Sequence, residues 1–176
     1  MATITRVFEF DAAHRVMNEK VKCFNLHGHR FKVEATFEYG NKKSLGYAID
    51  FKEIKRIVGT WIDEHLDHAA ILNPYDEQLI MLCKNYNWRL YIMGMGTFKD
   101  LNPSAENIAS ELFYTISQFF LNGNTGVWLK KIRLYETPNC WVETSNYDYV
   151  ATNEYLSELK KWRSEKGTFN YDIRED

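Results

Sequence analysis

Two segments near the N-terminus alternate between apolar and polar residues and predict two β-strands. Over residues 3–14, one parity is apolar apart from Arg6 and ends at His14; its other members are Ile4, Phe8, Phe10 and Ala12. Residues 29–39 alternate in the same way, and the apolar parity there comprises Phe31, Val33, Ala35 and Phe37. Alternation of this kind gives a strand one apolar face. A sheet of such strands buries a single face, which favours antiparallel pairing.

The spacing of apolar residues then becomes helical. Residues 51–66 carry apolar side chains at helical spacing, and Asp50 can cap this helix at its start. A second helix is predicted over residues 104–121, with Ser104 as its N-cap. The segment Gly123–Gly126 ends it.

Strand patterns return after the second helix. Val127–Thr137 predicts one strand, and Cys140–Thr144 predicts a short partner beyond a turn at Pro138–Asn139. Residues 88–93 are a candidate edge strand between the two helices. The elements therefore follow the order strand, strand, helix, helix, strand, strand, which predicts an α+β fold.

The chain is predicted to hold one folded domain and an appendage. The domain spans residues 1–145 and includes an insertion at about 75–102. Residues 146–176 are rich in charge, and only 153–163 carry a weak helical signal. We expect this last segment to be a partly helical C-terminal appendage.

Composition excludes several classes of protein. The chain has 176 residues, 45% of them hydrophobic, and a net charge of −2, which argues against disorder and against a nucleic-acid or membrane-binding surface. No apolar run of about 18 residues is present, and the N-terminus does not resemble a signal peptide. The three cysteines, Cys23, Cys83 and Cys140, are widely spaced and do not suggest a disulfide framework. We expect a cytoplasmic protein.

Two of the five histidines lie in the short segment Cys23–His29. Side chains at i and i+2 of a strand project to the same face, so His27 and His29 can converge on one point. Gly28 between them leaves room for a neighbouring backbone. His14 can add a third nitrogen if the two strands form a hairpin, although a lone histidine on an apolar face is more often a hydrogen-bonded core residue. Three imidazoles with an open position fit a catalytic zinc ion better than a structural one.

Cys23 admits two roles beside such a metal. It is either a fourth ligand, which would close the site, or a free thiol that the metal activates as a base. The spacing does not separate these roles.

Asp67 and His68 follow the first predicted helix. An aspartate next to a histidine can fix the tautomer of the ring and stabilise its charged form. A solvated helix end is the other interpretation. A second metal pair, His65 with His68, is less favoured because His65 lies on the apolar face of the helix.

Glu136 shares strand parity with Ile132 and Leu134 and is expected to point to the apolar side. A buried carboxylate needs a partner, and a planar ligand with two parallel N–H donors would bind it bidentately. A buried salt bridge to Arg133 or to a lysine is the alternative, although Arg133 faces the other side of the strand. Glu106 is less informative, because the helix dipole alone favours an acid in the first turn.

Six short segments, taken together, resemble the 6-pyruvoyl-tetrahydropterin synthase superfamily, in the family's order and over most of residues 3–144. They are FDAAHR (10–15), CFNLHGH (23–29), AIDF (48–51), LDHAAILN (66–73), NPSAENIA (102–109) and YETPNC (135–140). The Cys-x3-His-Gly-His spacing is similar to the 6-carboxy-5,6,7,8-tetrahydropterin synthase branch of queuosine biosynthesis. The resemblance implies the T-fold (tunnelling fold), an antiparallel four-stranded sheet with two helices on one face. It also implies assembly into barrel-like oligomers, commonly hexamers.

The resemblance further implies the roles of individual residues. The ligands of Zn²⁺ would be His14, His27 and His29. The catalytic groups would be Cys23 as proton acceptor, His68 with Asp67 as a relay, and Glu136 as the group that holds the amino-pyrimidinone edge of a pterin. Further candidates for substrate binding are Glu106, Ser104 and, for a triphosphate, Arg15.

The implied reaction converts 7,8-dihydroneopterin triphosphate to 6-carboxytetrahydropterin, acetaldehyde and triphosphate. Two alternatives remain open: a 6-pyruvoyl-tetrahydropterin synthase that only eliminates triphosphate, and a T-fold that binds a pterin or purine without catalysis. The sequence departs from the family pattern at Ser104, where the family usually has threonine, in the insertion, and in the residues after 145.

Overall fold

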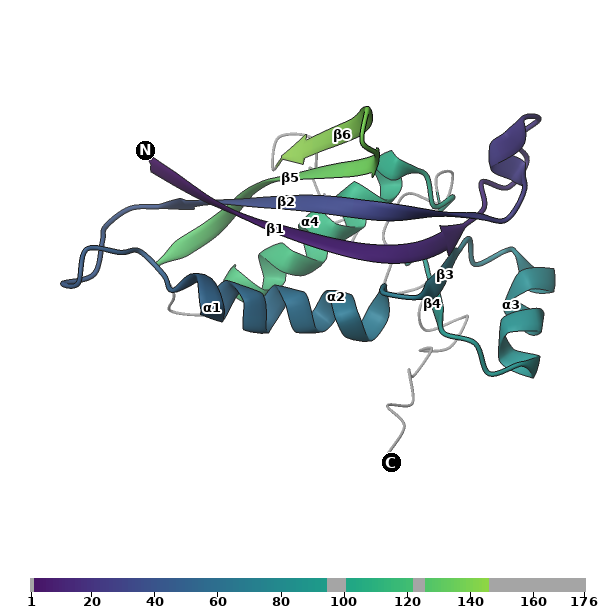
Figure 1. The fold of residues 1–176 in the computed structure, drawn as a ribbon, viewed down its shortest axis with the longest axis horizontal. Coiled ribbons are helices and arrows are strands. Elements are labelled where there is room, and N and C mark those ends of the chain that lie inside the picture. The colour runs from purple at the N-terminus through teal and green to yellow at the C-terminus, as the bar shows by residue number, and fades with distance from the viewer. Residues whose placement is uncertain (1, 95–100, 122–125, 146–176) are drawn as a thin grey trace, which may run out of the picture.

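The computed structural model describes residues 2–94, 101–121 and 126–145 of the chain. A six-stranded sheet with the order β4-β3-β1-β2-β5-β6 forms its centre (Figure 1). The strands are β1 (Ala2–His14), β2 (His27–Tyr39), β3 (Ala69–Leu72), β4 (Leu90–Ile92), β5 (Val127–Thr137) and β6 (Cys140–Ser145). The helical segments are η1 (Lys22–Phe24), α1 (Phe51–Ile54), η2 (Lys55–Gly59), α2 (Thr60–His65), α3 (Glu77–Asn85) and α4 (Ala105–Leu121).

Four strands form the long antiparallel part of the sheet that the alternation predicts. β1 pairs with β2 over their full length, from Ala2 opposite Tyr39 to His14 opposite His27. β5 pairs antiparallel with both β2 and β6. This register places the last residue of β1 beside the first residues of β2, because the two strands are joined by a loop at that end.

Both predicted helices are present. α1, the π-helical η2 and α2 form one continuous helical segment, and the Asp50 side chain caps it by accepting a hydrogen bond from the Lys52 amide at 2.8 Å. At the start of α4, the Asn107 amide donates to Ser104 Oγ at 3.4 Å, so Ser104 is the expected N-cap. These helices and the apolar strand positions enclose one core; members with no more than 1% exposure include Phe31, Ile54, Ile116 and Leu134.

Two short strands and α3 lie between the predicted helices, and of these three elements the sequence predicted only β4. β3 pairs parallel with the end of β1, at Ala12–His14, and β4 pairs parallel with β3. Alternate residues of β3 face opposite sides, so Ile71 joins the main core whereas Leu72 packs with Ile80 of α3 in a second, smaller cluster. α3 therefore lies on the face of the sheet opposite to α4.

The expectation of a purely antiparallel sheet of four strands is wrong, because the sheet has six strands and two of its pairings are parallel. The antiparallel four-stranded part and the two helices on one face are present, and β4 occupies the predicted edge position within residues 88–93. The weak helical signal at 153–163 lies outside the described residues. None of the described helices is long and apolar enough to cross a membrane.

Candidate metal centre and active site

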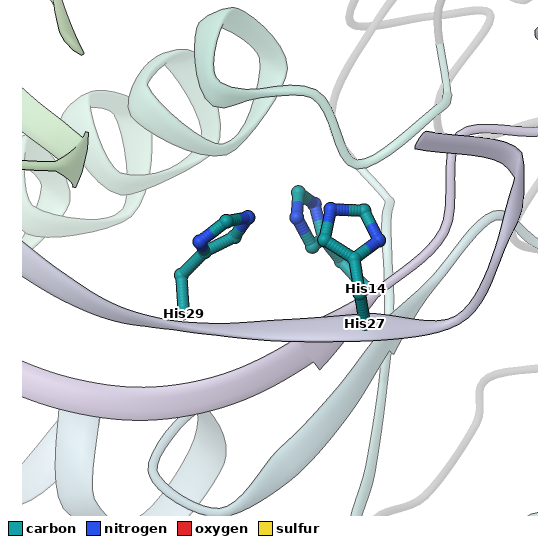
Figure 2. A group of neighbouring side chains, drawn as sticks. All are labelled: His14, His27 and His29. Atoms are coloured by element: carbon teal, nitrogen blue, oxygen red, sulfur yellow. The ribbon is translucent and has the colours of Figure 1, made fainter. Parts of the chain in front are cut away.

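The hairpin of β1 and β2 brings three histidines together. Figure 2 shows the rings of His14, His27 and His29 on the same side of the two strands. One ring nitrogen from each lies within 4.8 Å of the corresponding nitrogens of the other two. Gly28 allows the strands to approach, because a Cβ there would lie only 3.2 Å from the carbonyl oxygen of Ala12.

Backbone carbonyls fix the tautomers of two of these rings. His14 Nδ1 donates to the carbonyl oxygen of Pro103 at 2.6 Å, and His27 Nδ1 donates to that of Asn25 at 2.7 Å. In a neutral imidazole the other nitrogen, Nε2, then carries a lone pair. Both rings therefore present Nε2 as a metal ligand, with a carbonyl holding the opposite nitrogen as is usual around metal sites.

The buried position of His14 is the strongest sign that a metal binds here. The residue is 1% exposed, and its Nε2 has no hydrogen-bond partner among the described residues. Burial lowers the pKa of this imidazole and outweighs the hydrogen bond to the Pro103 carbonyl, which raises it. A neutral ring with an unpaired buried nitrogen is costly unless that nitrogen is coordinated. The donor set therefore fits a divalent metal, and three nitrogens with a free position are typical of catalytic zinc.

We predict that His14→Ala loses its zinc. Removing a ligand should cost more than the roughly 10²-fold loss of affinity that follows loss of an outer-shell partner. The measurement is zinc per chain after dialysis against a chelator, with a thermal unfolding curve to confirm folding. The matched control is His65→Ala, because His65 bonds the Trp61 carbonyl at 2.9 Å and is not part of the cluster. Equal zinc content in the two variants would contradict the site.

Cys23 lies in the loop between the two strands that carry the histidines. It belongs to η1, is exposed, and its carbonyl accepts a hydrogen bond from the Val16 amide at 2.9 Å. Among the described residues, the group with suitable ligand atoms consists of the three histidines and does not include Cys23. This geometry favours the free-thiol role over that of a fourth ligand.

Asp67 holds His68 in the arrangement expected of an aspartate–histidine relay. His68 Nδ1 lies 2.8 Å from Asp67 Oδ2, and Asp67 Oδ1 accepts a hydrogen bond from the Asp11 amide at 2.9 Å. The His68 backbone has a φ of 59°, a conformation that non-glycine residues rarely adopt. Such backbone strain is found most often at functional sites.

This pair lies on the opposite face of the sheet from the histidine cluster. Asp11 is three residues before His14 on β1, so its side chain points to the other face, where it pairs with Arg30. A cavity of about 600 Å³ beside this pair is lined by His68, Asp11, Arg30 and residues of α3, and His29 of β2 also contributes to its lining. The strand alternation therefore directs Asp11, whose amide bonds Asp67, to the face opposite to the ring of His14.

Glu136 points toward the histidine cluster, as its strand parity predicts. Its Oε1 lies 3.5 Å from His14 Nε2 and 4.0 Å from His29 Nε2. The alternative of a salt bridge to Arg133 is wrong, because Arg133 pairs with Glu143 at 2.8 Å. The Glu136 side chain is 28% exposed, so a ligand bound over the cluster could reach its carboxylate.

Two further candidates for substrate binding, Ser104 and Glu106, lie at the start of α4. Ser104 and Glu106 follow Pro103, whose carbonyl holds His14. Glu106 is exposed.

Residues 3–146 match the family described as 6-pyruvoyl tetrahydropterin synthase. The chain belongs to this family.

Curated relatives within the 6-pyruvoyl tetrahydropterin synthase family carry a more specific name. A 6-carboxy-5,6,7,8-tetrahydropterin synthase of Rickettsia felis is 39% identical over 145 residues, covering 81% of this chain and 99% of the relative. One of Haemophilus influenzae with the same name is 30% identical over 151 residues, covering 81% of this chain and 98% of the relative.

Solved structures support the fold of this family. A 6-pyruvoyl tetrahydropterin synthase of Caenorhabditis elegans aligns with a TM-score of 0.58 at 23% identity, covering 82% of this chain and 95% of that one. An uncharacterised protein of Wolinella succinogenes aligns with a TM-score of 0.64 at 23% identity, covering 82% of this chain and 98% of that one. At this identity the likeness shows the fold alone.

Two groups that contribute to the site have no recognisable signal in the local sequence. The Pro103 carbonyl orients His14, and Asn102 bridges to the Met17 backbone with hydrogen bonds of 2.9 and 3.0 Å. Both act through contacts between residues more than 80 positions apart. The segment NPSAENIA marked the region, but no local pattern revealed which backbone group it holds.

Proposed function

We propose that this chain catalyses the 6-carboxy-5,6,7,8-tetrahydropterin synthase reaction as a zinc-dependent lyase. The substrates are 7,8-dihydroneopterin triphosphate and water, and the products are 6-carboxytetrahydropterin, acetaldehyde and triphosphate. The observation that carries the proposal is the three-histidine cluster, in which His14 is buried and its Nε2 has no hydrogen-bond partner among the described residues, in a chain 39% identical to a relative of that name. The product would enter the pathway to queuosine and other 7-deazaguanines.

Each site residue then has a task. When bound, Zn²⁺ supplies a Lewis acid for the hydroxyl and carbonyl oxygens of the substrate side chain. Cys23 takes a proton from a side-chain carbon, and His68, oriented by Asp67, returns one at another position. Glu136 holds the amino-pyrimidinone edge, because its carboxylate faces the cluster and keeps access to solvent.

The two proton-transfer groups come from different copies of the chain in this proposal. Asp67 and His68 lie on the opposite face of β1 and β2 from the cluster, so one chain alone does not gather the full set. A homo-oligomer, commonly a hexamer in this family, would place His68 of one copy against the Cys23 loop of another. Within the described part of the chain, this edge of β1 pairs with β3 at Ala12–His14 and is otherwise unpaired, which supports assembly through strand edges.

The test is product analysis. Zinc-loaded protein incubated with 7,8-dihydroneopterin triphosphate should give 6-carboxytetrahydropterin and acetaldehyde by mass spectrometry, and removal of the metal with a chelator should stop the reaction. A pyruvoyl product would instead assign the chain to the reaction named by its family. Stoichiometric pterin binding without turnover at full zinc occupancy would show a non-catalytic protein.

A further inference from the structure

Arg15 and Asp76 form an ion pair between the end of β1 and the start of α3. Arg15 Nε donates to Asp76 Oδ2 at 2.7 Å and Arg15 Nη2 donates to Oδ1 at 2.5 Å, so the contact is bidentate. The Asp76 side chain is 1% exposed and that of Arg15 is 17% exposed. Asp76 Oδ1 also accepts a hydrogen bond from the Leu79 amide and thereby caps α3. The pair thus fastens the residue after the metal ligand His14 to the insertion.

The same guanidinium contacts the loop that carries Cys23. The Cζ of Arg15 lies 5.2 Å from the centre of the Phe24 ring, within cation–π distance. The next residue, Val16, donates its amide hydrogen to the Cys23 carbonyl at 2.9 Å. Two adjacent residues, Arg15 and Val16, therefore hold two adjacent residues of η1, Cys23 and Phe24.

We infer that the Arg15–Asp76 pair is a positioning device that fixes the Cys23 loop, residues 15–26, against α3. Arg15 is then a positioning residue, and the insertion acts through it on the placement of the thiol. The consequence for catalysis rests on the proposed function, whereas the consequence for the position of Cys23 does not.

The sequence suggested that Arg15 binds the triphosphate of the substrate, and a positioning role differs from that expectation. Both oxygens of the Asp76 carboxylate are bound to Arg15, and the carboxylate is buried. Moving the guanidinium to a phosphate would leave a buried carboxylate without its counter-ion, which is strongly unfavourable. The geometry therefore favours a fixed structural contact over a substrate contact.

The test is Arg15→Lys, which keeps a positive charge beside Asp76 so that the chain can fold, but loses the planar fork that pairs bidentately and lies on Phe24. The alkylation rate of Cys23 should change by at least about threefold, because thiol reactivity depends on its local surroundings. The rate is read by mass spectrometry of the Cys23 peptide. The exposed Cys140 in the same molecules serves as internal standard and should not change.

In turnover, Arg15→Lys should lower kcat by between about 10-fold and 10²-fold with KM unchanged, because a misplaced group loses rate without losing substrate affinity. Zinc content should stay at the wild-type value. Phe24→Leu leaves the ion pair intact and should shift Cys23 alkylation in the same direction. The matched control is Arg56→Lys, because Arg56 makes the same bidentate contact with Glu53 at 2.7 and 3.0 Å on the helix surface.

Two results would overturn the inference. One is a Cys23 alkylation rate in Arg15→Lys equal to that in Arg56→Lys. The other is a raised KM with an unchanged kcat, which would assign Arg15 to the substrate. If wild-type protein gives no pterin product, the proposed function fails, but the alkylation rates still decide the role of Arg15.

Discussion

Cys23→Ala is expected to lose most of its turnover and to keep the zinc content of the wild type. The histidine cluster alone gathers the ligand atoms, and Cys23 is not part of it among the described residues. Under the proposed roles, loss of the thiol removes a base without removing a ligand. A positioned base contributes roughly 10²–10⁴-fold to the rate, so kcat should fall by that factor. The measurements are kcat with 7,8-dihydroneopterin triphosphate and zinc per chain on the same preparation.

Cys140→Ala is the matched control for this variant. Cys140 is also an exposed free cysteine, but it begins β6, at the turn of the β5–β6 hairpin. Its replacement should leave both kcat and zinc content unchanged. Loss of zinc from Cys23→Ala would instead make Cys23 the fourth ligand, which would close the metal site.

The antiparallel part of the fold was predictable because its signals are local. Alternation along β1 and β2 decides which residues face the core, and it placed His14 on the buried face. The i and i+2 spacing of His27 and His29 likewise fixed their common face. The site was therefore foreseeable wherever a strand period alone determines the direction of a side chain.

The strand β3 was not predictable from the same kind of signal. β3 is only four residues long and pairs parallel with the last residues of β1, so its strand character depends on a neighbour supplied by the fold. Short apolar runs of this length are compatible with either a strand or a buried helical turn. The face on which His68 stands follows from that pairing, which explains why the sequence revealed the Asp67–His68 pair but not its separation from the histidines.

The contact between Arg15 and Asp76 was not predictable from the sequence for a related reason. Asp76 is 61 positions away, and its own sequence context marks it only as a helix cap. A cation next to a metal ligand suggested an anionic substrate, but the structure places a buried carboxylate there.

Mixing two inactive variants is expected to restore activity if the site is shared between copies. His68→Ala keeps an intact Cys23, and Cys23→Ala keeps an intact His68. In the proposed site the Cys23 loop of one copy meets the Asp67–His68 pair of another, so a mixed assembly contains some sites in which both residues are intact. Random assembly of equal amounts should regenerate about a quarter of the sites, so activity should rise from near zero to a comparable fraction of the wild-type rate. The variants are unfolded together, refolded and assayed.

The control mixture is His68→Ala with Asp67→Ala. Both changes damage the same half of the site, since Asp67 Oδ2 holds His68 Nδ1 at 2.8 Å, and no assembly of these two variants contains an intact relay. This mixture should therefore stay inactive. Subunit exchange is verified by native mass spectrometry of chains that differ in mass. If exchange occurs and the Cys23→Ala and His68→Ala mixture also stays inactive, the thiol and the relay do not act from different copies, because only a composite site gains from mixing.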